Sequence, residues 1–192
     1  SSLTRIESFA FQNCSSLSKF KIPSHVSFIG EHAFFLCYKL KEILFEEDSE
    51  LKSIEKDVFS RSSIERISIT SSIEKLGEGW CCGTPKLTTV LISENNRHFQ
   101  YADKEKKMVV CKSNESENDF DVLAFVSRDV KSVIVPSNIR KINSFAFDEC
   151  KYLKSINFSD DSELKSIDKY AFYLSTVESI HIPKNVEELK DG

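Results

Sequence analysis

Apolar and polar residues alternate along the chain in short segments that recur at a regular interval. In the segment 40–45, which reads Leu-x-x-Ile-x-Phe, Ile43 and Phe45 face one side and Leu44 faces the other, which is the two-residue period of a β-strand. The same order of apolar residues returns with a shift of about 23 residues, within the range of solenoid repeats. No such segment can bury its apolar face alone. The pattern therefore predicts stacked coils with a parallel strand ladder and a continuous apolar core.

A duplication of the array strengthens the repeat assignment. The segment 23–76 matches the segment 136–189 position for position, with about 25 identical residues among some 54. Both copies contain Asp-Ser-Glu-Leu-Lys-Ser-Ile, at 48–54 and at 161–167. Ala-Phe recurs at the turn of the coils, where the alanine suits a tight bend and the phenylalanine fills the interior.

The spacing changes in the middle of the chain. Leu87 and Val130 hold equivalent positions but lie 43 residues apart, so some 20 extra residues enter here. We therefore divide the chain into N-terminal repeats (1–92), an irregular insert (93–129) and C-terminal repeats (130–192). Three apolar segments separated by polar runs predict a β-hairpin or three-stranded insert. Such an insert can belong to a binding face, or it can be a decorated coil without a ligand.

The repeat unit resembles the BspA-type leucine-rich repeat. The motif Ile-x-x-Ile-x-x-x-Ala-Phe-x-x-Cys-x-x-Leu-x-x-Ile-x-Ile-Pro is most complete in 26–45, 3–23 and 139–158, and the resemblance covers nearly the whole chain. It implies surface proteins of mucosal bacteria and of protists such as trichomonads, which are implicated in adhesion to host matrix proteins, host cells or other microbes. The sequence departs from the motif at 80–82 (Trp-Cys-Cys) and at Val58, where we expect local distortion.

The fold expected from these observations is a single leucine-rich-repeat solenoid over 1–192. This class is grouped with α/β folds by convention, but here it should be β-dominated. We expect about seven coils in a curved parallel ladder, a β-hairpin-like insert, and short 3₁₀ or helical turns on the outer side. The chain begins and ends within the repeat pattern, so we expect a fragment of a longer array with any signal or anchor outside it.

Composition excludes several classes of function. The net charge is −4 and Lys and Glu are mixed along the chain, which argues against nucleic-acid binding. No apolar stretch approaches the roughly 20 residues that span a bilayer, so we expect no direct membrane insertion by these residues.

No motif points to catalysis. The chain lacks a nucleophile elbow, a phosphate-binding glycine loop and a dinucleotide fingerprint, and its four histidines show no metal-ligand spacing. We therefore expect no enzyme, no cofactor and no metal. Cys14, Cys37 and Cys150 share one repeat position and are expected to be buried thiols, although a Cys14–Cys37 disulfide between adjacent coils remains open. Among three sequons, Asn114 in a polar loop is the best candidate for glycosylation.

Outward positions of the strand ladder give the candidate binding residues. Leu44, Leu91 and Ile134 are apolar where solvent is expected, and we expect them to form a patch beside the insert. The rim of this patch is polar and consists of Glu42, Arg66 and Lys131. The alternative is that the insert packs on Leu91 and Ile134 and covers them.

The predicted function is a cell-surface or secreted adhesion module that binds an extracellular-matrix or cell-surface protein. The alternative is an intracellular scaffold or structural array without a host ligand. Exposed repeat ends could also pair edge to edge, so self-association is open as well.

Overall fold

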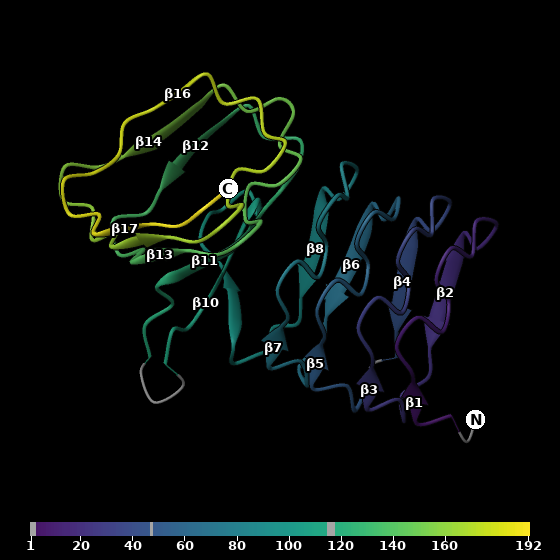
Figure 1. Ribbon diagram of the computed structural model, residues 1–192. Coiled ribbons are helices and arrows are strands. Elements are labelled where there is room, and N and C mark those ends of the chain that lie inside the picture. The colour runs from purple at the N-terminus through teal and green to yellow at the C-terminus, as the bar shows by residue number, and fades with distance from the viewer. Residues whose placement is uncertain (1–2, 47, 115–117) are drawn as a thin grey trace. The chain divides into compact units, whose positions relative to one another are not determined.

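The computed structural model describes residues 3–46, 48–114 and 118–192, and it divides the chain into two compact units, 1–98 and 99–192. Within the described residues the regular structure is all β, in about eight turns of a solenoid, so the predicted leucine-rich-repeat fold is confirmed and about seven coils was a close count (Figure 1).

The first unit contains a long parallel ladder and, on another side of the coils, pairs of two-residue strands. The four ladder strands lie side by side in the order β2 (Lys19–Ile22), β4 (Glu42–Phe45), β6 (Arg66–Ile69) and β8 (Thr89–Ile92). The short strands pair as β1 (Arg5–Ile6) with β3 (Phe28–Ile29), and β5 (Ser53–Ile54) with β7 (Lys75–Leu76).

The second unit has a three-stranded parallel ladder and a six-stranded mixed sheet. The ladder is β12 (Ser132–Val135), β14 (Ser155–Phe158) and β16 (Ser179–Ile180). The mixed sheet runs β17 (Glu188–Leu189), β15 (Ser166–Ile167), β13 (Lys141–Ile142), β11 (Val122–Val126), β10 (Met108–Cys111) and β9 (Phe99–Tyr101).

The insert forms three strands, as its apolar segments predict. β9 pairs antiparallel with β10, and β10 pairs antiparallel with β11 across a register shift between Val109 and Val110. β11 then pairs in parallel with β13, so the insert extends a repeat-derived sheet within the second unit. Asp103 fixes the turn before β10 because its carboxylate accepts hydrogen bonds from the backbone N–H groups of Lys107 and Met108.

The core is built from the apolar repeat positions. Ile43, Ile67 and Leu87 are buried in the first unit, and Val133 and Ile156 are buried in the second. Each such side chain contributes about 1.5–3 kcal/mol relative to full exposure.

The phenylalanines stack from coil to coil inside each unit, which confirms their predicted interior role. The rings of Phe11 and Phe34 are stacked at 5.1 Å between centroids, and Phe34 continues to Phe59 at 5.6 Å. In the second unit Phe147 stacks on Phe172 at 5.0 Å. Such pairs add about 0.5–1.5 kcal/mol beyond their buried area.

The outer side of the coils differs from expectation, because the described residues form hydrogen-bonded turns there and no 3₁₀ or α-helix. Backbone N–H groups alternate between a local turn and the next coil: Ala33 donates to Gly30, Phe34 to Val58, and Phe35 to His32. Two residues per coil take positive φ, such as His32 (58°) and Leu36 (60°), and this left-handed geometry interrupts a helix.

The expected distortion at 80–82 is absent from the backbone. Trp80 donates to the carbonyl of Gly77 and Phe59 donates to that of Trp80, the same bonds that other coils make. Trp80 and Cys81 are buried in place of Ala-Phe, and Gly79 supplies one of the two positive φ values of the coil. The coil of Val58 keeps the same bond through the N–H of Phe34.

Candidate functional site

The outward face of the β2–β4–β6–β8 ladder holds four of the predicted binding residues. The register places Lys21 beside Leu44 and Ser68 beside Leu91 along the middle of the face, as the alternation predicts. Leu91 is 43% exposed and Leu44 is partly exposed. An apolar side chain that faces solvent on an ordered ladder is available to a partner.

Glu42 and Arg66 form the next row of this face, where they are paired in register between β4 and β6. Glu42 is held by Lys19, with 2.9 Å between Nζ and Oε2. Within 3–46, 48–114 and 118–192, the exposed Arg66 has no ion-pair partner for its guanidinium group. The exposed guanidinium group of Arg66 can thus meet an acidic group on a partner.

Ion pairs neutralise the start of the face. Lys21 contacts Glu46 at 2.8 Å, and the hydrogen bonds from Lys21 and from the backbone N–H of Ser24 hold the pKa of Glu46 below its usual value. The apolar side chains and Arg66 are thus the part of this face that is available for binding.

Ile134 and Lys131 belong to the second unit, on or beside the β12–β14–β16 ladder. Ile134 is 70% exposed and lies next to Asn157 in register, so the insert strands β9, β10 and β11, which are in the same unit, do not cover it. The residues of the predicted patch thus belong to two ladders, one in each unit.

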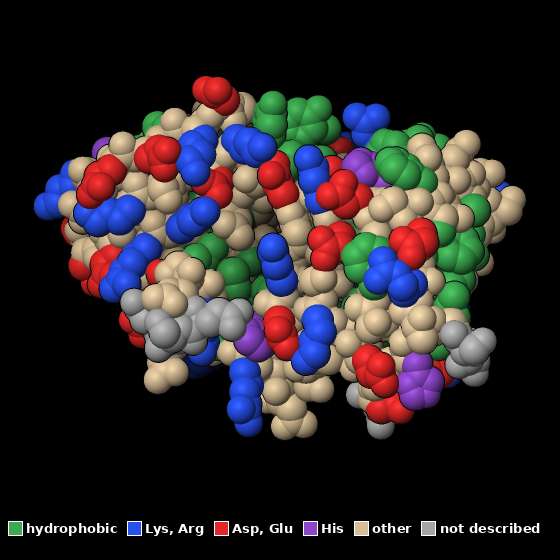
Figure 2. All heavy atoms as spheres, turned by 60° about the horizontal axis from the view of Figure 1, so that its bottom comes forward, with side chains coloured by type: hydrophobic (Ala, Val, Ile, Leu, Met, Phe, Trp, Pro, Cys, Tyr) green, Lys and Arg blue, Asp and Glu red, His purple; other side chains and the backbone are tan. Residues whose placement is uncertain are grey.

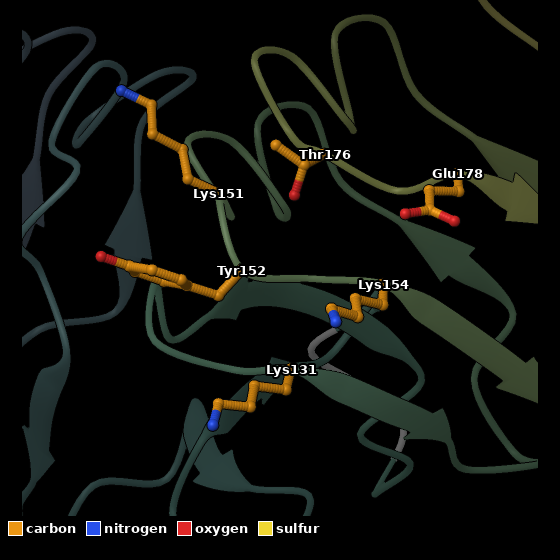
Figure 3. Close-up of a pocket in the computed structure, with 6 residues that line it drawn as sticks. All are labelled: Lys131, Lys151, Tyr152, Lys154, Thr176 and Glu178. Atoms are coloured by element: carbon orange, nitrogen blue, oxygen red, sulfur yellow. The ribbon is translucent and has the colours of Figure 1, made fainter.

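Lys131 lines a hollow that the sequence analysis did not identify. Its cavity volume is about 260 Å³, and its lining residues are Lys131, Lys151, Tyr152, Lys154, Thr176 and Glu178 (Figure 3). A comparison of equivalent repeat positions could have pointed to the extra positive charge of this hollow, since Lys131 takes the place of Ser18.

Asn114 is exposed, whereas residues 115 and 116 of its sequon lie outside the described residues. The six cysteines are free thiols, and Cys37 donates its Sγ–H to the carbonyl of Phe11 at 3.1 Å rather than bonding to Cys14. Burial raises the pKa values of Cys37 and Cys150, which favours inert thiols.

A buried ion pair in the second unit also escaped the sequence analysis. Arg128 and Asp148 are both fully buried, with 3.8 Å between Nη2 and Oδ2. Arg128 also donates to the carbonyls of Val126 and Ala146 and lies 4.7 Å from the ring centroid of Phe125. Arg128 stands in a polar stretch, Ser-Arg-Asp, that gives no sign of burial.

Neither a metal centre nor a membrane span emerges from the part of the chain that the structure describes. There, no group of three or more His, Cys, Asp or Glu residues is placed to hold a metal ion, and no helix is long and apolar enough to cross a bilayer. Lys, Arg, Asp and Glu side chains are interspersed on the face that Figure 2 shows, without one large basic patch.

Comparison with known proteins decides the family. The BspA type Leucine rich repeat region matches residues 1–103 and 119–192 in six copies. The chain belongs to the BspA-type leucine-rich-repeat family. No curated protein matches the chain.

Solved structures show the same fold. The pneumococcal vaccine antigen PcpA superposes with a TM-score of 0.82 and 24% identity over 99% of this chain and 51% of that chain. A leucine-rich repeat protein from Eubacterium ventriosum gives 0.77 and 21% over 99% and 54% of the two chains. A leucine rich cell surface protein from Faecalibacterium prausnitzii gives 0.71 and 21% over 95% and 58%. The chain spans between half and three-fifths of the length of these proteins.

Proposed function

We propose that this BspA-type array is a protein-binding adhesion module of a cell-surface or secreted protein. Its partner is an extracellular-matrix or cell-surface protein. The observation that carries the proposal is the pair Leu44 and Leu91, which face solvent on an ordered parallel ladder beside the exposed Arg66. Solenoids bind along such extended surfaces, and interfaces favour apolar centres with arginine near them.

The names of similar structures support a surface location. One similar structure is described as a vaccine antigen and another as a cell surface protein. Leucine-rich-repeat solenoids typically act as binding scaffolds, and the ladder face of this chain offers apolar and charged side chains for such contacts.

The test is binding of the purified protein to a panel of immobilised extracellular-matrix proteins and to intact epithelial cells. A Leu44→Glu/Leu91→Glu variant, checked by circular dichroism to be folded, should lose saturable binding, because it places two carboxylates at the centre of the interface. Ile134→Glu, measured separately, shows whether the second ladder takes part. Leu174→Glu is the matched control, since Leu174 is 51% exposed but stands in a turn. Equal binding by Leu44→Glu/Leu91→Glu and wild type would refute this face as the site.

The second candidate function is an intracellular scaffold, and the six free cysteines favour it. Localisation of the full-length protein in its own cell separates the two functions. Surface labelling, or glycan occupancy at Asn114, supports the adhesion module. An internal, fully reduced protein supports the scaffold.

A further inference from the structure

The hollow at the start of the second ladder differs in charge from its counterpart in the first copy. Lys131, Lys154 and Glu178 immediately precede β12, β14 and β16, so they stand in one row at the edge of the ladder (Figure 3). In the first copy the same row is Ser18, Lys41 and Glu65.

The lysines of the second row are not neutralised. Lys41 contacts Glu65 at 3.5 Å at the matched position of the first unit. Among the residues that the structure describes, neither Lys131 nor Lys154 has an ion-pair partner. The backbone is the same in both ladders, because the N–H of Lys154 donates to the carbonyl of Lys131 at 2.9 Å, as the N–H of Lys41 does to that of Ser18.

The remaining charge in the hollow fits one anionic group. Lys151 is already paired with Glu149 at 2.6 Å. Lys131 and Lys154 together outweigh Glu178 by a single positive charge, which suits a monoanion and is too little for a nucleic acid or another polyanion.

The neutral groups of the hollow suit a sugar ring. Tyr152 is 63% exposed and presents an aromatic face, whose negative π surface attracts the polarised C–H groups of a pyranose. The hydroxyl of Thr176 donates a hydrogen bond to the carbonyl of Leu153, and its oxygen can still accept one from a sugar hydroxyl. The carboxylate of Glu178 can accept hydrogen bonds from sugar hydroxyls as well.

A peptide is disfavoured at this edge. Extended peptides bind through backbone hydrogen bonds to a free strand edge. Here the N–H of Lys154 is bonded to the carbonyl of Lys131, and the N–H of Thr176 to the carbonyl of Cys150, so these groups are already used.

We propose that the hollow lined by Lys131, Tyr152, Lys154, Thr176 and Glu178 binds an acidic monosaccharide unit of a glycan. The carboxylate of the sugar lies between Lys131 and Lys154, and its ring lies against Tyr152. The site is separate from the Leu44–Leu91 face and does not depend on that face being a protein interface.

The test is a titration of the isotopically labelled 192-residue protein with N-acetylneuraminic acid and with glucuronic acid, followed by NMR. N-acetylglucosamine is the neutral probe, and a short Glu-containing peptide is the peptide probe. The expected result is saturable shifts at residues of the hollow with an acidic sugar, with a dissociation constant on the order of millimolar, and weaker or no shifts with the other two probes.

Variants locate the site. Lys131→Gln/Lys154→Gln should weaken acidic-sugar binding by about fivefold, since the two exposed ion pairs together contribute on the order of 1 kcal/mol. Tyr152→Ala should abolish ring-dependent shifts, and Tyr152→Phe should retain them. Lys41→Gln, the matched position in the first copy, should bind like wild type. All variants must keep the wild-type melting temperature.

Three results would overturn the proposal. These are equal shifts with acidic and neutral sugars, equal weakening by Lys41→Gln, and tighter binding of the acidic peptide at the same residues. Loss of matrix-protein binding in the Leu44→Glu/Leu91→Glu variant leaves these titrations unchanged, so the two sites fail or succeed separately.

Discussion

The buried pair of Arg128 and Asp148 gives the sharpest prediction for a single residue. Both side chains are fully buried, and removal of Arg128 leaves the carboxylate of Asp148 in the core without its cation. Arg128→Ala should therefore lower the free energy of unfolding by about 3–5 kcal/mol, measured by urea denaturation.

The paired replacement is the control for this prediction. Arg128→Met/Asp148→Leu removes both charges at similar volume and should recover most of the loss. If Arg128→Ala costs less than about 1 kcal/mol, the pair is not buried in solution as described.

Cys111 is a thiol whose reactivity the fold strongly lowers. Burial, with a smaller contribution from the charge of Asp121, raises the pKa of Cys111 to about 12. At pH 8 only about one thiol in 10⁴ is then ionised, and the thiolate is the reactive form. Alkylation by iodoacetamide at pH 8 should be far slower in the native protein than in urea, as followed by mass spectrometry of the Cys111 peptide.

The raised pKa of Cys111 also makes the free energy of unfolding depend on pH. An unfolded cysteine has a pKa of about 8.5. Below that pH both states are protonated and the stability is complete, while above it the unfolded state releases a proton that the folded state retains until about pH 12. The free energy of unfolding should thus fall above about pH 8.5. Alkylation of Cys111 at equal rates in native and unfolded protein would contradict the assignment.

At the scale of the element, two neighbouring coils approach each other closely at Gly77. A Cβ atom at Gly77 would lie 2.6 Å from the backbone of Glu55 and Lys56 in the adjacent coil, and backbone cannot rotate away. Gly77→Ala should lower the free energy of unfolding by about 1–3 kcal/mol, measured by thermal or urea denaturation.

Gly83 offers the matched control for this prediction. It has a φ of 68°, but a Cβ there meets chiefly the flexible side chain of Arg61, and the equivalent positions 13, 36 and 61 carry side chains at positive φ. Gly83→Asn should cost less than about 0.5 kcal/mol, because asparagine tolerates this conformation. Equal losses in Gly77→Ala and Gly83→Asn would show that backbone conformation, not coil contact, sets the cost.

Strands were predictable from the sequence and turns were not. Alternation fixes the inward and outward faces, so the register of Leu44 and Leu91 followed directly from the pattern. The turn geometry depends on hydrogen bonds between coils, such as His32 to Lys56, which join residues 24 positions apart. Local sequence propensity does not reveal hydrogen bonds between coils. Helical turns were therefore expected at positions where the structure has residues in the left-handed conformation.

The candidate site was predictable only in part, for a similar reason. Leu44, Leu91 and Ile134 stand out because each is apolar at an outward position. Tyr152 and Lys154 carry no such signal, since exposed tyrosines and lysines are ordinary on a surface. What distinguishes them is that they line one hollow together with side chains from neighbouring coils, and this is a fact of three-dimensional geometry.

At the scale of the whole molecule, the coils of each unit are stacked so that a coil packs against the coils before and after it. In the second unit Phe147 is fully buried, stacks on Phe172, and bonds through its N–H to the carbonyl of Ala171. Stability in such an array is approximately a sum of coil and nearest-neighbour terms. A defect should therefore weaken nearby coils first.

Phe147→Ala tests this locality by hydrogen exchange. The substitution should cost about 3–5 kcal/mol in the coils that it touches, because it removes a stacked ring and leaves a cavity. Amides of β13, β14 and β15 should lose most of their protection, whereas amides of β2 and β4 in the first unit should exchange as in wild type. A uniform loss of protection across both units would instead mean that the chain unfolds as one cooperative body, since only global opening exposes distant coils to the same extent.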